Sequence, residues 1–142
     1  TTAPTLPAAV TRVQILGSTG AVNANVEASL KTKLGAGNVE RLAGGSRYET
    51  AVAIATYGVE HTGLSWDAVA ITTGANFPDA LGGGVLQGKS GSVMLLTDPK
   101  SLSLPTKTAL ITNKATIHTI RYLGSTGAVS QVVRDAIAGV LE

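Results

Sequence analysis

Short runs of apolar residues alternate along this chain with longer segments in which apolar residues recur every three or four positions. The runs at residues 68–73 and 93–97 are continuously apolar, which is typical of strands buried on both faces of a parallel sheet. Alternation of such strands with helices predicts an α/β fold, with a mostly parallel sheet and helices on both of its faces. The predicted strands are residues 13–16, 39–42, 68–73, 93–97 and 117–123.

Polar residues mark where the helices between these strands begin. Asn23 precedes an apolar stripe that includes Val26 and Leu30, so it predicts a helix N-cap. Ser46 and Glu49 have the spacing of a capping box, in which each side chain accepts a hydrogen bond from the other residue's backbone N–H. Further helices are predicted for residues 78–87, for residues 105–113 and after Ser130.

One stretch of seven residues occurs twice. Leu-Gly-Ser-Thr-Gly-Ala-Val at residues 16–22 recurs without change at residues 123–129, which is 107 residues later (123 − 16). The apolar positions around the two stretches also agree, so they are copies of one strand–turn–helix segment. We therefore expect residues 1–12 to be a linker, residues 13–37 the end of one repeat and residues 38–142 a complete repeat, with residues 13–142 forming one compact unit.

Composition narrows the possible functions. The chain has 142 residues and no Cys, which excludes disulfides, thiolate nucleophiles and cysteine-ligated metal sites. Only 14% of its residues are charged and the formal net charge is +2, so we expect no nucleic acid partner, which would need a denser basic surface. No apolar run reaches the roughly 18 residues of a membrane span, and no signal peptide pattern is visible, so we expect no membrane insertion.

Two kinds of glycine-rich segment resemble nucleotide-binding motifs. Residues 83–90 have the spacing of a phosphate-binding loop, but that loop follows a strand and precedes a helix, and here the predicted order is reversed. Gly17 with Gly20, and Gly124 with Gly127, resemble the start of a dinucleotide fingerprint but lack its third glycine. We interpret them as strand-to-helix turns in which glycine supplies a positive φ.

No pattern for catalysis or metal binding is evident in the sequence. His61 and His118 have no carboxylates at metal-ligand spacing, and no Asp-x-Asp pair occurs. We therefore predict no catalytic residue, no metal and no cofactor, and we interpret both histidines as structural.

Two segments carry the candidate binding residues. Arg47 follows a glycine turn, and Asn76, Phe77 and Asp79 follow a predicted strand at the end where open α/β sheets bind ligands. In one interpretation Arg47 pairs with Asp79 and fastens two loops; in the other, Arg47 and Asn76 contact a ligand. We favour the pair, and expect the more exposed ligand contacts elsewhere. The candidate binding residues are Arg12, Arg41, Arg47, Asn76, Lys89 and Arg121, with Arg12, Arg41, Lys89 and Arg121 as the more exposed.

The same segments resemble a known family. Residues 41–51, Arg-Leu-Ala-Gly-Gly-Ser-Arg-Tyr-Glu-Thr-Ala, are similar to the RLAGxDRYxTA motif of the cell-wall-binding repeat family, type 2. Residues 73–81 resemble its tGenFpDAL signature, residues 94–97 its PillT strand and residues 123–130 its iGGtgavS ending. Ser46 replaces the usual Asp, and Val93-Met94 the common Pro-Ile. The residues expected to be structural are Ser46, Tyr48, Glu49, Phe77, Asp79 and the glycines Gly17, Gly20, Gly124 and Gly127.

This resemblance implies a Toprim-like topology and a non-catalytic module that anchors a surface protein, an S-layer protein or a wall hydrolase. The implied partners are an anionic secondary cell-wall polymer of the teichoic type, or peptidoglycan, and neighbouring copies of the module, for example in a trimer. The implied location is the extracellular wall or surface of a Gram-positive-type bacterium. An alternative is a small nucleotide-binding or hydrolytic α/β domain that uses the loops at residues 17–20 and 76–79.

Overall fold

The computed structural model describes residues 5–142, so residues 1–4 of the expected linker lie outside the described residues. No helix in the described part is long and apolar enough to cross a membrane. The elements are, in order, β1 (Val13–Leu16), α1 (Ala24–Leu34), η1 (Ala36–Asn38), β2 (Val39–Leu42), α2 (Arg47–His61), β3 (Ser65–Thr73), α3 (Pro78–Lys89), β4 (Ser92–Thr97), α4 (Leu104–Asn113), η2 (Lys114–Thr116), β5 (Thr119–Tyr122) and α5 (Gln131–Leu141).

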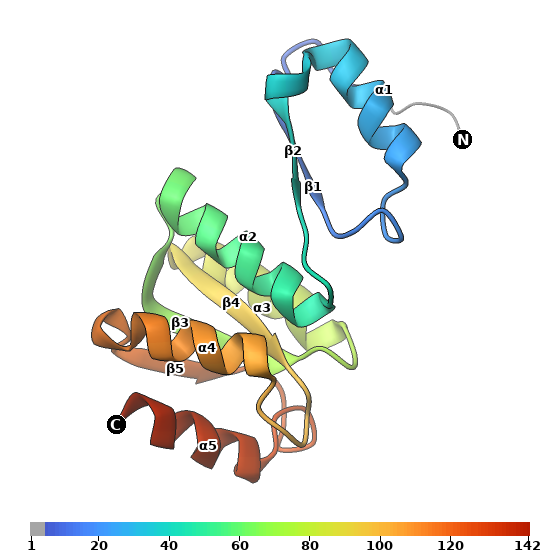
Figure 1. The fold of residues 1–142 in the computed structure, drawn as a ribbon. Coiled ribbons are helices and arrows are strands. Elements are labelled where there is room, and N and C mark those ends of the chain that lie inside the picture. The colour runs from blue at the N-terminus through green and yellow to red at the C-terminus, as the bar shows by residue number, and fades with distance from the viewer. Residues whose placement is uncertain (1–4) are drawn as a thin grey trace.

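The strand pairs are all parallel, as predicted, but they form two sheets rather than one (Figure 1). β1 pairs with β2, with Val13 opposite Val39. The other sheet has the order β4–β3–β5, with β3 in the centre. We call residues 13–42, which contain β1, α1 and β2, the N-terminal unit, and residues 47–141, from α2 to α5, the body.

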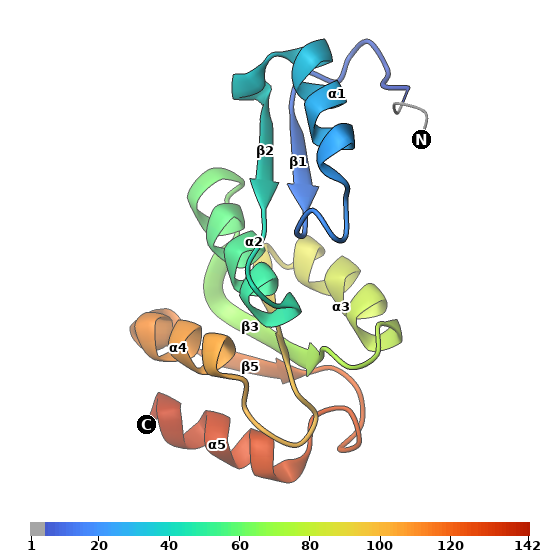
Figure 2. The same ribbon diagram turned by 45° about the vertical axis from the view of Figure 1, so that its right-hand side comes forward.

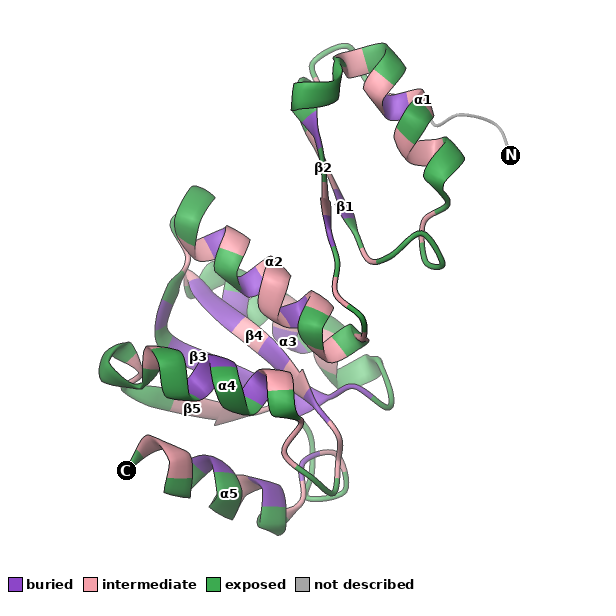
Figure 3. Cartoon of the chain, viewed as in Figure 1, coloured by how far each residue is buried: buried purple, intermediate pink, exposed green. Residues whose placement is uncertain are grey.

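The main core lies in the body, between its sheet and three helices. Figure 3 shows buried positions along β3 and β4 and on α2, α4 and α5. Ile71 of β3 and Leu95 of β4 are fully buried, because helices cover the sheet. The buried residues of this core are Ala55, Trp66, Val69, Ile71, Val93, Leu95, Ala109, Leu110, Val129, Val133 and Ile137.

The remaining helix, α3, covers the opposite face of the body's sheet (Figure 2). Its Gln87 is buried and donates from Nε2 to the backbone oxygens of Ala68 and Val93, at 2.7 and 2.8 Å. These bonds satisfy a polar group that would otherwise destabilise the fold. Helices therefore lie on both faces of a parallel sheet, and the predicted fold class is confirmed.

The N-terminal unit has a small core of its own. Ile15, Leu30 and Val39 are buried there, one from each of β1, α1 and β2. The unit lies beside the body and does not extend its sheet (Figures 1 and 2). Gln14 bridges the two parts, since its Nε2 donates to the hydroxyl of Tyr57 in α2 at 2.8 Å.

The predicted helix starts are confirmed. Asn23 caps α1, and Ser130 caps α5, each by accepting a backbone N–H of the first turn on its side-chain oxygen. Ser46 and Glu49 form the capping box of α2: Ser46 Oγ accepts from Glu49 N at 3.3 Å, and Glu49 Oε2 accepts from Ser46 N at 2.8 Å. These ends are set by residues close in sequence.

Several predicted boundaries differ by a few residues. β3 begins at Ser65 instead of residue 68, and α3 continues to Lys89 instead of residue 87. β5 is shorter than predicted because its pairing with β3 starts only at Thr119. Residues 83–90 lie at the end of α3 with β4 after them, so the predicted order, the reverse of a phosphate-binding loop, is confirmed.

Candidate functional site

The carboxyl end of β3 meets the start of α2 at one edge of the body. Arg47, the first residue of α2, donates from Nη1 to the backbone oxygen of Gly74, just after β3. A Cβ at position 74 would meet the ring of Tyr48 and the side chain of Arg47, so glycine allows this close approach. Asn76 and Phe77 follow in the same loop and are exposed.

Three adjoining hollows follow this edge, and together we call them the carboxyl-edge groove. The middle hollow has a volume of about 290 Å³ and is lined by Arg47, Asn76 and Phe77. It shares Arg47, Ala80 and Leu96 with a hollow of about 530 Å³ on the side of the N-terminal unit. It shares Asn76 and Phe77 with a hollow of about 490 Å³ on the other side. The structure thus brings Arg47 and Asn76 together in one groove.

The repeated turn lies at both ends of the carboxyl-edge groove. Gly17 and Ser18 of the first copy line the hollow beside the N-terminal unit. Ser125 and Gly127 of the second copy line the hollow at the far end. Two segments that are far apart in the chain therefore contribute the same residue types to the same groove.

Each turn is shaped by its first glycine. Gly17 and Gly124 have φ angles of 101° and 96°, in the left-handed region that favours glycine. Gly20 and Gly127 do not have positive φ, so that prediction is confirmed only for the first glycine of each turn. At Gly124 a Cβ would in addition meet the carboxylate of Asp79, the second residue of α3.

Few charges line the groove. Among its lining residues within the described chain, Arg47 is the only cation and Asp79 the only carboxylate. The predicted ion pair between them is wrong. Arg47 instead bonds to the oxygen of Gly74, and Asp79 lies against Gly124. Arg47 is exposed, and no carboxylate is among the described residues that line the middle hollow. The groove therefore carries a positive charge near its centre.

Arg41 is a structural residue of the N-terminal unit. Its side chain is only 14% exposed, and its Nε pairs with Glu27 Oε2 at 2.8 Å. Nη1 and Nη2 donate to the backbone oxygens of Gly17 and Val22, at 2.7 and 2.9 Å. Hydrogen bonds from Lys31 and then Arg41 hold the pKa of Glu27 below its usual range. The expectation that Arg41 is one of the more exposed cations is wrong, because β2 places it against the turn after β1.

The other candidate cations do not gather at the groove. Arg121 is half-buried, and its Nη1 donates to Gln87 Oε1 at 2.9 Å, so the expectation that its side chain is exposed is wrong too. Lys89 is exposed but is the last residue of α3, at the end away from the groove. Arg12 is exposed before β1.

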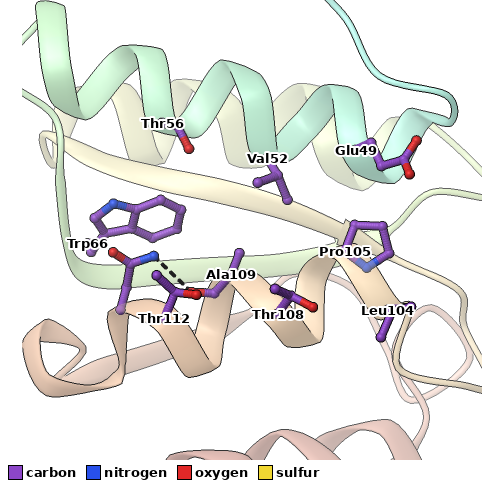
Figure 4. Close-up of a pocket in the computed structure, with 10 residues that line it drawn as sticks. Glu49, Val52, Thr56, Trp66, Leu104, Pro105, Thr108, Ala109 and Thr112 are labelled. Atoms are coloured by element: carbon purple, nitrogen blue, oxygen red, sulfur yellow. Dashed lines mark hydrogen bonds between the residues drawn. The ribbon is translucent and has the colours of Figure 1, made fainter.

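A separate pocket between α2 and α4 was not predicted from the sequence. Figure 4 shows Trp66 at one end of the pocket and Pro105 of α4 at the other, with Val52 of α2 between them. The pocket has a volume of about 460 Å³. The only Trp of the chain, just before a predicted strand, is the one signal that could have indicated it. Its other lining residues are Glu49, Thr56, Leu104, Thr108, Ala109, Thr112 and Asn113.

One close contact of a histidine was also missed. His118 Nδ1 lies 2.6 Å from Asp67 Oδ1, and both side chains are exposed. The two residues are far apart in sequence, so no spacing rule could have joined them. Within residues 5–142, no group of three or more His, Asp or Glu residues is placed to hold a metal ion.

Comparison with known proteins gives a family and a fold. Residues 41–134 match the family described as Cell wall binding domain 2 (CWB2). Among solved structures, the chain is similar to Cwp8 from Clostridium difficile, with a TM-score of 0.71 and 22% identity over 94% of this chain and 21% of that chain. It is also similar to Cwp6 from Clostridium difficile, with a TM-score of 0.77 and 23% identity over 92% of this chain and 20% of that chain. No curated protein sequence is significantly similar.

Proposed function

Because the chain belongs to the Cell wall binding domain 2 family, we propose that it is a non-catalytic module that anchors a larger protein to the cell wall. The ligand is an anionic secondary wall polymer, bound non-covalently in the carboxyl-edge groove. The chain spans about a fifth of the length of the two similar solved chains, which supports a module within a longer surface protein. We place that protein on the outer wall of a Gram-positive-type bacterium.

The position of Arg47 in the groove carries this proposal. A guanidinium has five N–H donors, and the bond to Gly74 uses one of them while fixing the side chain in place. Its planar fork suits the paired oxygens of a phosphate or carboxylate. An exposed, oriented cation in the middle of a groove is therefore suited to a polymer that carries such groups.

The length of the groove favours a chain-like ligand. Three hollows in a row can take consecutive units of a polymer, whereas a small molecule would fill only one of them. Asn76 beside Arg47, and Ser18 and Ser125 at the two ends, can donate to hydroxyl or phosphate oxygens. A ligand with a repeating unit would meet the same turn residues at both ends.

Charge favours this groove over the pocket at Trp66. Glu49 lines that pocket, and no Lys or Arg is among its described lining residues. A carboxylate repels an anionic ligand, and no cation offsets the repulsion. We therefore assign the polymer to the carboxyl-edge groove.

Retention on purified walls tests this proposal. We expect the chain to be retained on intact walls and lost from walls stripped chemically of anionic polymers. Arg47→Gln should weaken retention about 10- to 100-fold, the range for losing a charged hydrogen-bonding partner. Its effect should shrink as salt is raised, because ions screen the same contact. Lys107→Gln, an exposed cation on α4, is the matched control and should bind as the parent does.

Three outcomes would contradict the proposal. Equal retention on stripped walls would mean that peptidoglycan itself is the ligand. An equal loss in Lys107→Gln would mean that overall charge, and not the groove, holds the polymer. Asn76→Asp adds an anion to the groove without touching the Arg47–Gly74 bond, so full retention of that variant would place the ligand elsewhere.

We further expect the module to work together with neighbouring copies, as in a trimer. One groove with one cation gives weak binding. Linked modules raise the overall affinity about 10²- to 10⁴-fold when they can engage one polymer together.

A further inference from the structure

The second copy of the repeated segment shows what covers such a segment. Leu123 packs against α3 at Gly83, where a Cβ would overlap the leucine side chain. Its backbone N donates to the oxygen of Ile71 in β3 at 2.9 Å. At the start of α5, the backbone N of Ser130 donates to the oxygen of Pro99 at 2.9 Å. The cover thus comes from β3, α3 and the loop after β4.

The first copy lacks this cover at the matching positions. Leu16 matches Leu123 but is 52% exposed. Val22 is half-buried, whereas its match Val129 is fully buried. The helix that follows repeats the difference at one matched pair, since Val26 of α1 is half-buried and its match Val133 of α5 is fully buried. Within the described chain, Leu16 and Val22 are therefore each more exposed than their matches in the second copy.

The backbone gives the same result. Gly17 N donates to the oxygen of Leu42 in β2 at 2.8 Å. Successive N–H groups along a strand point to opposite sides, so the N–H of Leu16 points away from β2. The matching N–H, that of Leu123, is the one that bonds to β3. β1 therefore leaves open the edge through which β5 pairs with β3.

We propose that this open edge receives the sheet of a second module, so that β1 and α1 become the last strand and helix of that module. The occupant is a segment equivalent to residues 38–118, which contain every element of a repeat except β5 and α5. A β3-type strand then bonds to the N–H of Leu16, and a glycine equivalent to Gly83 lies over its side chain. The resulting sheet has four parallel strands, in the order β4–β3–β1–β2.

The segment that pairs with β1 must precede β1 in the same polypeptide chain. A second intact copy of this chain cannot supply it, because the β3 edge of that copy is already filled by its own β5. Thr119 matches Arg12 in the repeat, so a preceding module would run without a gap into β1. Consecutive modules would then be fastened by a shared sheet and not by a flexible linker. This inference does not depend on the wall polymer.

An extended chain tests it. A copy of residues 38–118 is joined directly before Arg12 of the full chain, and amide hydrogen exchange is compared with that of the original. We expect the amides of Leu16 and of α1 to exchange at least about tenfold more slowly in the extended chain, approaching those of Leu123 and α5. Leu16→Asp should leave the original chain as stable as before and destabilise the extended chain. Leu123→Asp, the matched control, should destabilise both.

Three results would overturn the proposal. The first is an unchanged exchange rate at Leu16 in a chain whose added Trp66 equivalent is buried by fluorescence. The second is an added segment that stays unfolded, because the proposal holds that β1 and α1 are all that this segment lacks. In the original chain, a loss of stability in Leu16→Asp equal to that in Leu123→Asp would show that Leu16 is already covered, and would contradict the proposal as well.

Discussion

The two copies of the Leu-Gly-Ser-Thr-Gly-Ala-Val segment fold alike but are fastened by different contacts. In the first copy, Arg41 reaches across from β2 and holds the oxygens of Gly17 and Val22. In the second copy, Arg134 of α5 donates from Nε to the oxygen of Val129 at 3.0 Å, and its guanidinium carbon lies 4.6 Å from the ring centre of Tyr122. Each turn is thus held by an arginine from a different element.

This difference separates local from tertiary effects. The strand, the glycine turn and the helix cap appear in both copies, so residues close in sequence suffice for them. The burial of matched residues is not the same in the two copies, because it depends on which other elements pack against each copy. Ile137 packs in the main core of the body, whereas its match Leu30 packs in the small core of the N-terminal unit.

The largest contrast is expected for core truncation at these matched positions. Ile137→Ala should lower the free energy of unfolding of the body by about 2–5 kcal/mol, through lost apolar contacts and a cavity. Leu30→Ala should loosen the N-terminal unit and leave the body's transition almost unchanged. Urea unfolding followed by the fluorescence of Trp66 reports on the body. A shift for Leu30→Ala as large as that for Ile137→Ala would mean that the two parts unfold as one.

The next contrast concerns the first glycine of each turn. Gly17→Ala and Gly124→Ala should each cost about 1–2 kcal/mol, because both residues have positive φ. Gly124→Ala should cost more, since its methyl group would also meet the carboxylate of Asp79. Adding Asp79→Ala to Gly124→Ala should recover part of the loss in thermal unfolding. No recovery would mean that backbone strain alone sets the cost.

A contrast of comparable size is expected for the two arginines. Arg41→Met removes two charged hydrogen bonds to backbone oxygens and the ion pair with Glu27, and should destabilise the N-terminal unit by about 1.5–3 kcal/mol. Arg134→Met removes one such bond and a cation–π contact, and α5 is still held by the main core, so its effect should be smaller. Hydrogen exchange of α1 and α5 measures both. Faster exchange of α5 in Arg41→Met would contradict this separation.

The smallest contrast is in pH dependence. The region of the first copy should lose stability at low pH, and the region of the second copy at high pH. The pKa of Glu27 is lowered by hydrogen bonds from Lys31 and Arg41, so its contribution is present above the usual carboxyl pKa and is lost as pH falls through the lowered value. Burial raises the pKa of Tyr122, partly offset by Arg134, so its contribution is present below the usual tyrosine pKa and is lost as pH rises through the raised value.

Hydrogen exchange against pH checks both halves of this prediction. Glu27→Gln should remove the acid-side loosening of α1, and Tyr122→Phe should remove the alkaline-side loosening around β5. If Glu27→Gln leaves the acid response of α1 unchanged, another carboxylate is responsible for it.

Side-chain partners were predicted less well than elements, and the arginines show why. The capping box at Ser46 and Glu49 spans one helical turn, so its spacing alone identifies it. The partners of Arg41 lie 14 to 24 residues away, and its burial could not be inferred from its place in a motif. Arg47 was expected to pair with Asp79, but it donates instead to the backbone oxygen of Gly74. Every residue has a backbone oxygen, so the spacing of residue types cannot predict such a contact.

The sequence was enough for the order of elements, for the helix starts and for the existence of two equivalent segments, because each depends on residues a few positions apart. Only the tertiary structure decided that the strands form two sheets, and that Arg47 and Asn76 share a groove with both repeated turns. It also decided that Leu16 is exposed while its match Leu123 packs against α3. Burial is a property of what lies opposite a residue, and two segments of identical sequence can face different neighbours.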